Sequence, residues 1–313
     1  MKILFMGTPD FAVGIIDAIV NSGVGQVVAA VTQPDRPKGR SGALAASPVK
    51  EYAVSHGIRV MQPAKIKDKT EVAALMETGA DIFVVAAFGQ ILSREILDIP
   101  KYGCINVHAS LLPEYRGAAP IQWAIADGKK YTGVTIQQMN EGVDTGDIIS
   151  SVRVDIADDE TGASLFDKLR DAGAALIVDT LRQIENGGAG HTPQDESRAT
   201  YAKILKKEMG CIDFSRSATQ IERMIRAFTP WPGGYTYLNG RMIKIRECRV
   251  TEHSGNAAEC GSIVSVSGEG IKVACANGDL LITRLQPEGK KEMTAHDFLL
   301  GNKIEPGVIL GKK

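Results

Sequence analysis

The fold class is decided by one stretch, CINVH at residues 104–108, which is followed by ASLLP at residues 109–113. Residues 104–108 have the apolar character of a strand in the middle of a sheet, yet they include an amide and an imidazole. Asn106 and His108 are two residues apart, so on a strand both side chains point to the same face, about 6.5–7 Å apart at the backbone. In open parallel sheets, ligand sites lie at the carboxyl ends of the strands. The stretch therefore predicts a central strand that carries two polar side chains to a site.

On both sides of this stretch, strand-like apolar runs alternate with segments of helical character. The predicted strands are 2–6, 27–32, 59–61, 82–87, 133–139 and 148–154. The first predicted helix begins at Thr8 or Pro9 and ends at Ser22, and the others are 47–56, 70–77, 118–126 and 164–185. For the first helix, Thr8 suits the N-cap and Pro9 the first helical position. This alternation predicts an α/β fold in which a Rossmann-like, mainly parallel sheet is covered by helices.

The composition changes after residue 185. A glycine-rich stretch at 186–190 and a polar stretch at 191–200 are typical of a linker. One helix is predicted at 218–227, and short β runs follow at 235–238, 242–250, 261–266, 271–276 and 280–285. Asn239-Gly240 and Asn277-Gly278 are strong hairpin signals between these runs. We therefore expect a first domain over 1–188, a linker over 189–207, and a small β-barrel domain over 208–313.

Length and composition narrow the class of protein. With 313 residues, the chain is longer than a usual single core, and 44% hydrophobic with 23% charged residues is ordinary for a folded soluble protein. No stretch approaches the roughly 18 apolar residues of a membrane span, so we expect a cytoplasmic protein. The 5 cysteines form no CxxC pair and have no histidine at zinc-ligand spacing, which favours reduced thiols and no metal site.

The charge is unevenly distributed along the chain. Residues 1–200 contain 19 Lys and Arg against 25 Asp and Glu, a net of −6, whereas residues 201–313 contain 17 against 12, a net of +5. A basic module beside an acidic one is typical of a protein that holds a polyanion with its second half. An ordinary fluctuation of surface charge explains the same counts equally well.

The polar pair on the central strand has a chemical interpretation. An amide and an imidazole side by side can both donate hydrogen bonds to one developing oxyanion. The acidic turn VDTGD at 143–147 lies between two predicted strands, and it could aim Asp144 at the same pocket and so orient His108. The alternatives are a satisfied structural pair at a strand end and an ordinary surface turn.

These motifs together resemble the 10-formyltetrahydrofolate-dependent formyltransferase family. The resemblance rests on Asn106-x-His108, SLLP at 110–113, RGAAPIQ at 116–122 and DTGD at 144–147, in the order of the family. The opening GTPDFA at 7–12, TQPDRPKGR at 32–40 and Trp231-Pro232 resemble the branch of the family that formylates methionyl-tRNA. The motifs span essentially the whole chain.

The resemblance implies a reaction and a set of site residues. The formyl group of 10-formyltetrahydrofolate would pass to the α-amino group of an initiator methionyl-tRNA, without a metal. Asn106 and a protonated His108 would donate to the anionic oxygen of the intermediate, while Asp144 supports His108 and helps to remove the amine proton. The folate would lie against Ser110, Leu111, Leu112 and Pro113, with apolar support from Phe88, a residue that equally suits the core.

The resemblance also implies contacts with tRNA. The long loop 33–47 contains Arg36, Lys38 and Arg40, which would reach the acceptor stem, although a flexible solvated loop is the alternative. Residues 41–44, SGAL, stand where the family often has further lysines, and this lowers the charge of the loop. In the second half, Lys206 and Lys207 belong to a basic set on a barrel of oligonucleotide-binding (OB-like) topology. Nothing in the sequence calls for more than a monomer.

Other interpretations of the sequence remain open at this point. The acceptor could be a small amine, such as an amino-sugar nucleotide or glycinamide ribonucleotide. Asp144-Thr145-Gly146 also opens the active-site turn of aspartic proteases, but here it lies in an α/β domain. A dinucleotide-dependent dehydrogenase needs GxGxxG, which the GTPD at 7–10 lacks. A non-catalytic RNA-binding protein would leave the arrangement of Asn106, His108 and Asp144 unexplained.

Overall fold

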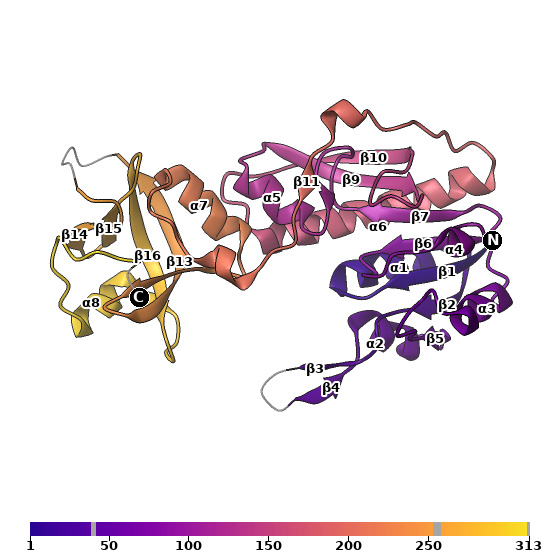
Figure 1. Ribbon diagram of the computed structural model, residues 1–313, viewed down its shortest axis with the longest axis horizontal. Coiled ribbons are helices and arrows are strands. Elements are labelled where there is room, and N and C mark those ends of the chain that lie inside the picture. Colours follow the sequence, from indigo (N-terminus) through magenta and orange to yellow (C-terminus); the bar gives the residue numbers. More distant parts are fainter. Residues whose placement is uncertain (39–41, 253–257, 312–313) are drawn as a thin grey trace. The chain divides into compact units, whose positions relative to one another are not determined.

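The computed structural model describes residues 1–38, 42–252 and 258–311, and the chain divides into two compact units (Figure 1). The first unit comprises Met1–Pro120, Tyr131–Asp155 and Phe166–Ala202. The second comprises Ile121–Lys130, Ile156–Leu165 and Lys203–Lys313. The three-part division that we expected, 1–188, 189–207 and 208–313, stays a prediction.

A seven-stranded sheet forms the centre of the first unit, in the order β10-β9-β7-β6-β1-β2-β5. Five strands pair in parallel: β1 (Lys2–Gly7), β2 (Gln26–Val31), β5 (Val60–Met61), β6 (Ile82–Ala86) and β7 (Cys104–His108). At one edge β9 (Tyr131–Gln138) is antiparallel to β7, and β10 (Ile148–Asp155) is antiparallel to β9. The predicted α/β fold with a mainly parallel sheet is therefore confirmed.

Helices pack on both faces of this sheet. They are α1 (Asp10–Ser22), α2 (Pro48–Ser55), α3 (Lys69–Glu77), α4 (Arg94–Leu97) and α6 (Gly162–Glu185). On one face Leu4 and Phe83 share a core with Leu75 of α3 and Ile96 of α4. On the other, α6 approaches so closely that a Cβ at Gly173 would lie within 3.4 Å of Ile15 and Val107. None of the described helices is both long and apolar enough to cross a membrane.

The start of α1 differs from the prediction. Pro9 is the N-cap and the helix begins at Asp10, so Thr8 is not the cap. The Thr8 hydroxyl instead donates to the carbonyl oxygen of Phe88 at 3.1 Å and accepts from the backbone N–H of Gln33 at 3.4 Å. Because these residues follow β1, β6 and β2, one hydroxyl ties together three loops at the carboxyl edge of the sheet.

Two very short pairings were not predicted from the sequence. β3 (Arg36–Lys38) and β4 (Ala43–Ala45) form an antiparallel hairpin within the loop 33–47, visible at the lower edge of the first unit in Figure 1. β8 (Arg116–Gly117) pairs in parallel with β11 (Tyr201–Ala202). Segments of two or three residues carry too little periodicity to be recognised. The second pairing joins the loop after β7 to the segment that we expected to be a linker.

The second unit contains an antiparallel sheet in the order β12-β13-β16-β15-β14, with β17 paired to β16. The strands are β12 (Gly234–Leu238), β13 (Arg241–Thr251), β14 (Ile263–Ser267), β15 (Gly270–Ala274), β16 (Asp279–Pro287) and β17 (Met293–Thr294). The helices α7 (Ala218–Ala227) and α8 (Ala295–Gly301) pack on it, and α5 (Pro120–Ala126) also belongs largely to this unit. Asn239 and Gly240 have φ of 50° and 76°, as a tight hairpin requires. The predicted β-rich second domain is confirmed.

Burial sorts the five thiols into two classes that a chemical reagent can distinguish. Cys104 and Cys275 are buried, and burial raises the pKa of each thiol to about 12. Burial also raises the pKa of Cys248, whereas Cys211 and Cys260 are exposed. Because the thiolate is the reactive form, we expect two thiols to react quickly with Ellman's reagent at pH 8 and three only after unfolding. Replacing Cys211 and Cys260 by Ser should remove the fast phase. Rapid modification of Cys104 in the folded protein would contradict this assignment.

Candidate active site

β7 places Asn106 and His108 near its carboxyl end, where the parallel strands of the first unit terminate. His108 is buried, and its Nε2 lies 2.9 Å from the carbonyl oxygen of Tyr115. A carbonyl oxygen only accepts, so Nε2 carries the hydrogen of this bond. The other ring nitrogen, Nδ1, lies 3.6 Å from Oδ2 of Asp144. The imidazole is therefore held between a backbone carbonyl and a carboxylate.

Asp144 lies in the turn after β9 and accepts hydrogen bonds from three sides. Its Oδ2 accepts from the backbone N–H of Gly117 at 2.8 Å. Its Oδ1 accepts from Nε2 of Gln137 at 2.9 Å and from Nδ2 of Asn106 at 3.4 Å. Two predicted site residues, Asn106 and His108, thus lie beside the carboxylate of a third, Asp144, whose side chain is 14% exposed. Their chemical roles stay a prediction.

Gln137 was not identified from the sequence, although the strand pairing explains its place. It lies opposite Asn106 in the antiparallel pairing of β7 with β9, and its side chain is buried. A polar residue on a buried strand, facing a polar residue on the neighbouring strand, is the signal that could have found it. The signal needs the register between β7 and β9, which the sequence does not provide.

The loop predicted to hold folate, Ser110–Pro113, is mostly buried. Ser110 is fully buried and its hydroxyl donates to the carbonyl oxygen of Glu114 at 2.5 Å. The Thr135 hydroxyl of β9 fastens the loop, because it donates to the Ser110 carbonyl at 2.7 Å and accepts from the Leu112 N–H at 3.0 Å. Of the four side chains, only that of Leu111 is partly exposed. A ligand at this loop would meet Leu111 and backbone groups.

A cavity of about 530 Å³ opens at the carboxyl edge of β1, β2 and β6. This size is within the usual range for small-molecule sites. Thr8, Gln33, Arg36 and Phe88 are among the residues that line it. The Phe88 side chain, however, is only 2% exposed and belongs to the core, so its proposed contact with folate stays a prediction.

The predicted tRNA contacts fall in both units. Arg36 begins β3, is exposed, and donates to Oε1 of Gln33 at 3.3 Å. Lys38 ends the same strand, and Arg40 lies outside the described residues. Lys206 and Lys207 are exposed in the second unit, where Lys207 begins the short 3-10 helix η2 (Lys207–Gly210). Within 1–38, 42–252 and 258–311, no group of three or more His, Cys, Asp or Glu side chains could hold a metal ion.

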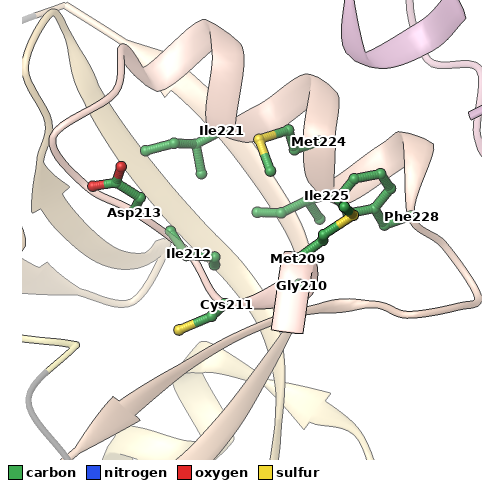
Figure 2. Close-up of a pocket in the computed structure, with 10 residues that line it drawn as sticks. Met209, Gly210, Cys211, Ile212, Asp213, Ile221, Met224, Ile225 and Phe228 are labelled. Carbon is green, nitrogen blue, oxygen red and sulfur yellow. The ribbon is translucent and has the colours of Figure 1, made fainter. Parts of the chain in front are cut away.

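A narrow crevice in the second unit lies between η2 with its following residues and α7. Figure 2 shows the side chains of Ile221, Met224 and Ile225 projecting from α7 toward this segment. The space left between them is only about 10 Å³, roughly the room of one water molecule. We interpret this crevice as a packing seam between the two segments.

A polar network centred on a buried arginine, next to the turn of Asp144, was also not identified from the sequence. The guanidinium of Arg116 is fully buried and donates to Glu196 at 2.7 and 2.9 Å and to Oε1 of Gln194 at 2.8 and 3.1 Å. The hydrogen bond with Glu196 raises the pKa of Arg116, and the same bond lowers the pKa of the Glu196 carboxyl, so both groups stay charged. Gln194 and Glu196 lie within the polar stretch that we expected to belong to a linker, and they pair with a residue about eighty positions away in the chain.

Two family models match the chain. The model described as formyl transferase matches residues 1–181, and the model described as formyl transferase, C-terminal domain, matches residues 204–303. Among curated relatives, the methionyl-tRNA formyltransferase of Lachnospira eligens is 49% identical, with 100% of each chain covered. That of Bacillus subtilis is 48% identical over 99% of this chain and 98% of its own length.

Solved structures with lower identity share the fold. An N-formyltransferase from Helicobacter canadensis in complex with folinic acid and dTDP-3-aminofucose has a TM-score of 0.65 at 19% identity, covering 92% of this chain and 99% of its own. HypX from Aquifex aeolicus in complex with tetrahydrofolic acid has a TM-score of 0.64 at 15% identity, covering 98% of this chain and 50% of its own. At these identities the likeness concerns the fold alone.

The turn that carries Asp144 depends on a glycine. A Cβ at Gly146 would lie 1.6 Å from the carbonyl oxygen of Gln138, so Gly146→Ala must displace the turn. We expect the free energy of unfolding to fall by roughly 1–3 kcal/mol, measured by urea titration. Gly190→Ala is the matched control in the same unit, because nothing lies within 4 Å of its Cβ. Equal stability of the two variants would contradict the packing described for this turn.

Proposed function

Because the chain belongs to the formyl transferase family, we propose that it transfers the formyl group of 10-formyltetrahydrofolate to the α-amino group of initiator methionyl-tRNA. The product is N-formylmethionyl-tRNA for translation initiation. The observation that carries this proposal is the identity of 48–49% over nearly full length with methionyl-tRNA formyltransferases. The contacts of Asn106 and His108 with the carboxylate of Asp144 support it chemically.

The reaction needs a site that manages one negative oxygen and one surplus proton. The neutral amine attacks the formyl carbon, a C–N bond forms, and the formyl oxygen becomes anionic. The attacking nitrogen then loses its surplus proton. The C=O bond re-forms as the bond from the formyl carbon to the folate nitrogen breaks, and the folate nitrogen takes up a proton as it leaves. Donors already aimed at the oxygen stabilise this charge strongly, since they need no reorganisation during the reaction.

The hydrogen bonds in the structure suggest how the three residues divide this work. Nδ2 of Asn106 carries two hydrogens, and only one of them can point at Asp144, so the other remains for the formyl oxygen. Nε2 of His108 is engaged with the Tyr115 carbonyl, which leaves Nδ1 as the nitrogen that can gain or lose a proton. Asp144 lies beside Nδ1, where its charge compensates an imidazolium.

The remaining assignments are part of the same proposal. The folate lies against Ser110–Pro113, reached through Leu111 and backbone groups, with Phe88 beneath it. Arg36, Lys38 and Arg40 of the loop 33–47 contact tRNA. Lys206 and Lys207 contact it from the second unit, in keeping with the net charge of +5 over residues 201–313. The enzyme acts in the cytoplasm as a monomer.

The competing interpretations receive less support. The sugar-related N-formyltransferase of Helicobacter canadensis shares the fold at 19% identity, far below the 49% of the methionyl-tRNA formyltransferase of Lachnospira eligens. A protease, a dehydrogenase and a non-catalytic RNA-binding protein do not agree with family models that match residues 1–181 and 204–303.

The acceptor can be identified by competition among amines. Purified protein with 10-formyltetrahydrofolate should formylate charged initiator methionyl-tRNA at least about 10³-fold more efficiently, by kcat/KM, than glycinamide ribonucleotide or an amino-sugar nucleotide. The reason is that most of the binding energy comes from the many phosphates of the tRNA backbone, whereas each small amine carries only one or two. Mass spectrometry of each acceptor measures the transfer. Preference for a small amine would refute the proposed acceptor while leaving formyl transfer intact.

His108 can be tested apart from tRNA binding. We expect His108→Ala to lower kcat/KM by about 10²–10³-fold, or about 3–4 kcal/mol, because it removes an imidazole that donates to the reacting groups. The Kd for methionyl-tRNA, measured by filter binding, should change by less than about threefold. His56→Ala, at an exposed histidine of the first unit, serves as the control and should behave as the unchanged protein. Parallel losses in rate and in tRNA affinity would indicate that His108 is structural.

A further inference from the structure

The loop after β7 is fixed by a distant segment of the first unit. The N–H groups of Tyr115 and Arg116 donate to the hydroxyl and carbonyl oxygens of Thr200 at 2.8 and 2.9 Å. The Thr200 N–H in turn donates to the Pro113 carbonyl at 3.2 Å. Since the Tyr115 carbonyl accepts from Nε2 of His108, these bonds hold the backbone group that orients the imidazole.

Within this loop the side chain of Arg116 determines how Gln194 is oriented. A fully buried guanidinium carries a large desolvation cost unless its donors are satisfied. Glu196 accepts from Nη1 and Nη2, and Oε1 of Gln194 accepts from Nε and Nη2. Because the guanidinium has no acceptor, the amide of Gln194 must present its oxygen to Arg116 and point its nitrogen the other way.

The nitrogen of Gln194 points at the turn that carries Asp144. Nε2 donates to the backbone carbonyl oxygens of Asp144 at 2.9 Å and Gly146 at 2.6 Å. Asp144 has a φ of 55°, a left-handed conformation that costs energy for a residue other than glycine. Such a conformation persists only where surrounding contacts stabilise it. The two hydrogen bonds from the Gln194 amide to the carbonyl groups of the turn provide this stabilisation.

We propose that Gln194, oriented by the buried Arg116, is a positioning residue that sets Asp144 against His108 and Asn106. The proposal rests on the proposed function, since it concerns the rate of that transfer. Gln194 donates to the backbone carbonyls of the turn and lies 3.5 Å from Oε1 of Gln137, whose Nε2 donates to the Asp144 carboxylate, and it makes no hydrogen bond with that carboxylate itself. Its loss should therefore lower kcat and leave substrate binding nearly unchanged.

Two substitutions of Gln194 test whether it positions the turn of Asp144 or only stabilises the fold. Gln194→Glu keeps an acceptor for Arg116 but removes both hydrogens that hold the turn, while Gln194→Met removes the acceptor as well. We expect each variant to lower kcat about 10²-fold, because a displacement of a reacting group by about 1 Å has an effect of this size. The KM values for folate and for methionyl-tRNA should stay within about threefold of those of the unchanged protein. Gln183→Met, at an exposed glutamine of α6, is the matched control and should keep full kcat.

Three results would overturn the proposal. The first is a kcat within about threefold of the unchanged protein in both Gln194 variants. The second is a loss in KM with kcat preserved, because it would make Gln194 a binding residue. The third is loss of the fold in both variants, measured by circular dichroism, because the network would then hold the unit together as a whole.

A spectroscopic readout separates this proposal from the proposed function. In protein labelled with ¹⁵N-histidine, the side-chain signals of His108, assigned with His108→Gln, should shift in Gln194→Glu and stay in place in Gln183→Met. This measurement needs no substrate. If the unchanged protein fails to formylate methionyl-tRNA, the proposed function is refuted. The His108 signals still show whether Gln194 positions the groups around His108. If transfer proceeds and the His108 signals do not move, the role of Gln194 alone is refuted.

Discussion

The carboxylate of Asp144 is the point on which the candidate site depends, because it lies among groups from three separate parts of the first unit. Asn106 and His108 reach it from β7, Gln137 from β9, and the N–H of Gly117 from the loop after β7. A carboxylate in a nearly dry position is stable only when such donors surround it. Because the carboxylate needs these donors, the side chains of Asn106 and His108 lie close to it and to each other.

Most of the fold could be predicted from the sequence, because long elements carry periodic information. The strand at 104–108 and the helix at 218–227 have the predicted bounds, since an apolar run and an amphipathic pattern leave little choice. The cap of α1 was predicted wrongly. Thr8 has the chemistry of an N-cap, but its hydroxyl is taken by the Phe88 carbonyl, a partner that exists only once β1 and β6 lie side by side.

The site was predictable where its residues stand close in sequence or in a known motif, and not where tertiary contacts define it. Asn106, His108 and Asp144 were found by strand geometry and by resemblance. Gln137 and Gln194 were missed, because an ordinary glutamine becomes informative only when its partner is known. The pairing of β8 with β11 was also missed, because two residues in each strand are too few to show a periodic sequence pattern.

The buried guanidinium of Arg116 also limits how far the first unit can be shortened. Gln194 and Glu196, which accept from its guanidinium, follow residue 188, and so does Thr200, which holds the adjoining backbone. A fragment truncated at residue 188 would lack both of these acceptors and leave the guanidinium without the Glu196 counterion. Any minimal version of the unit that keeps its architecture has to extend to Ala202, where β11 ends.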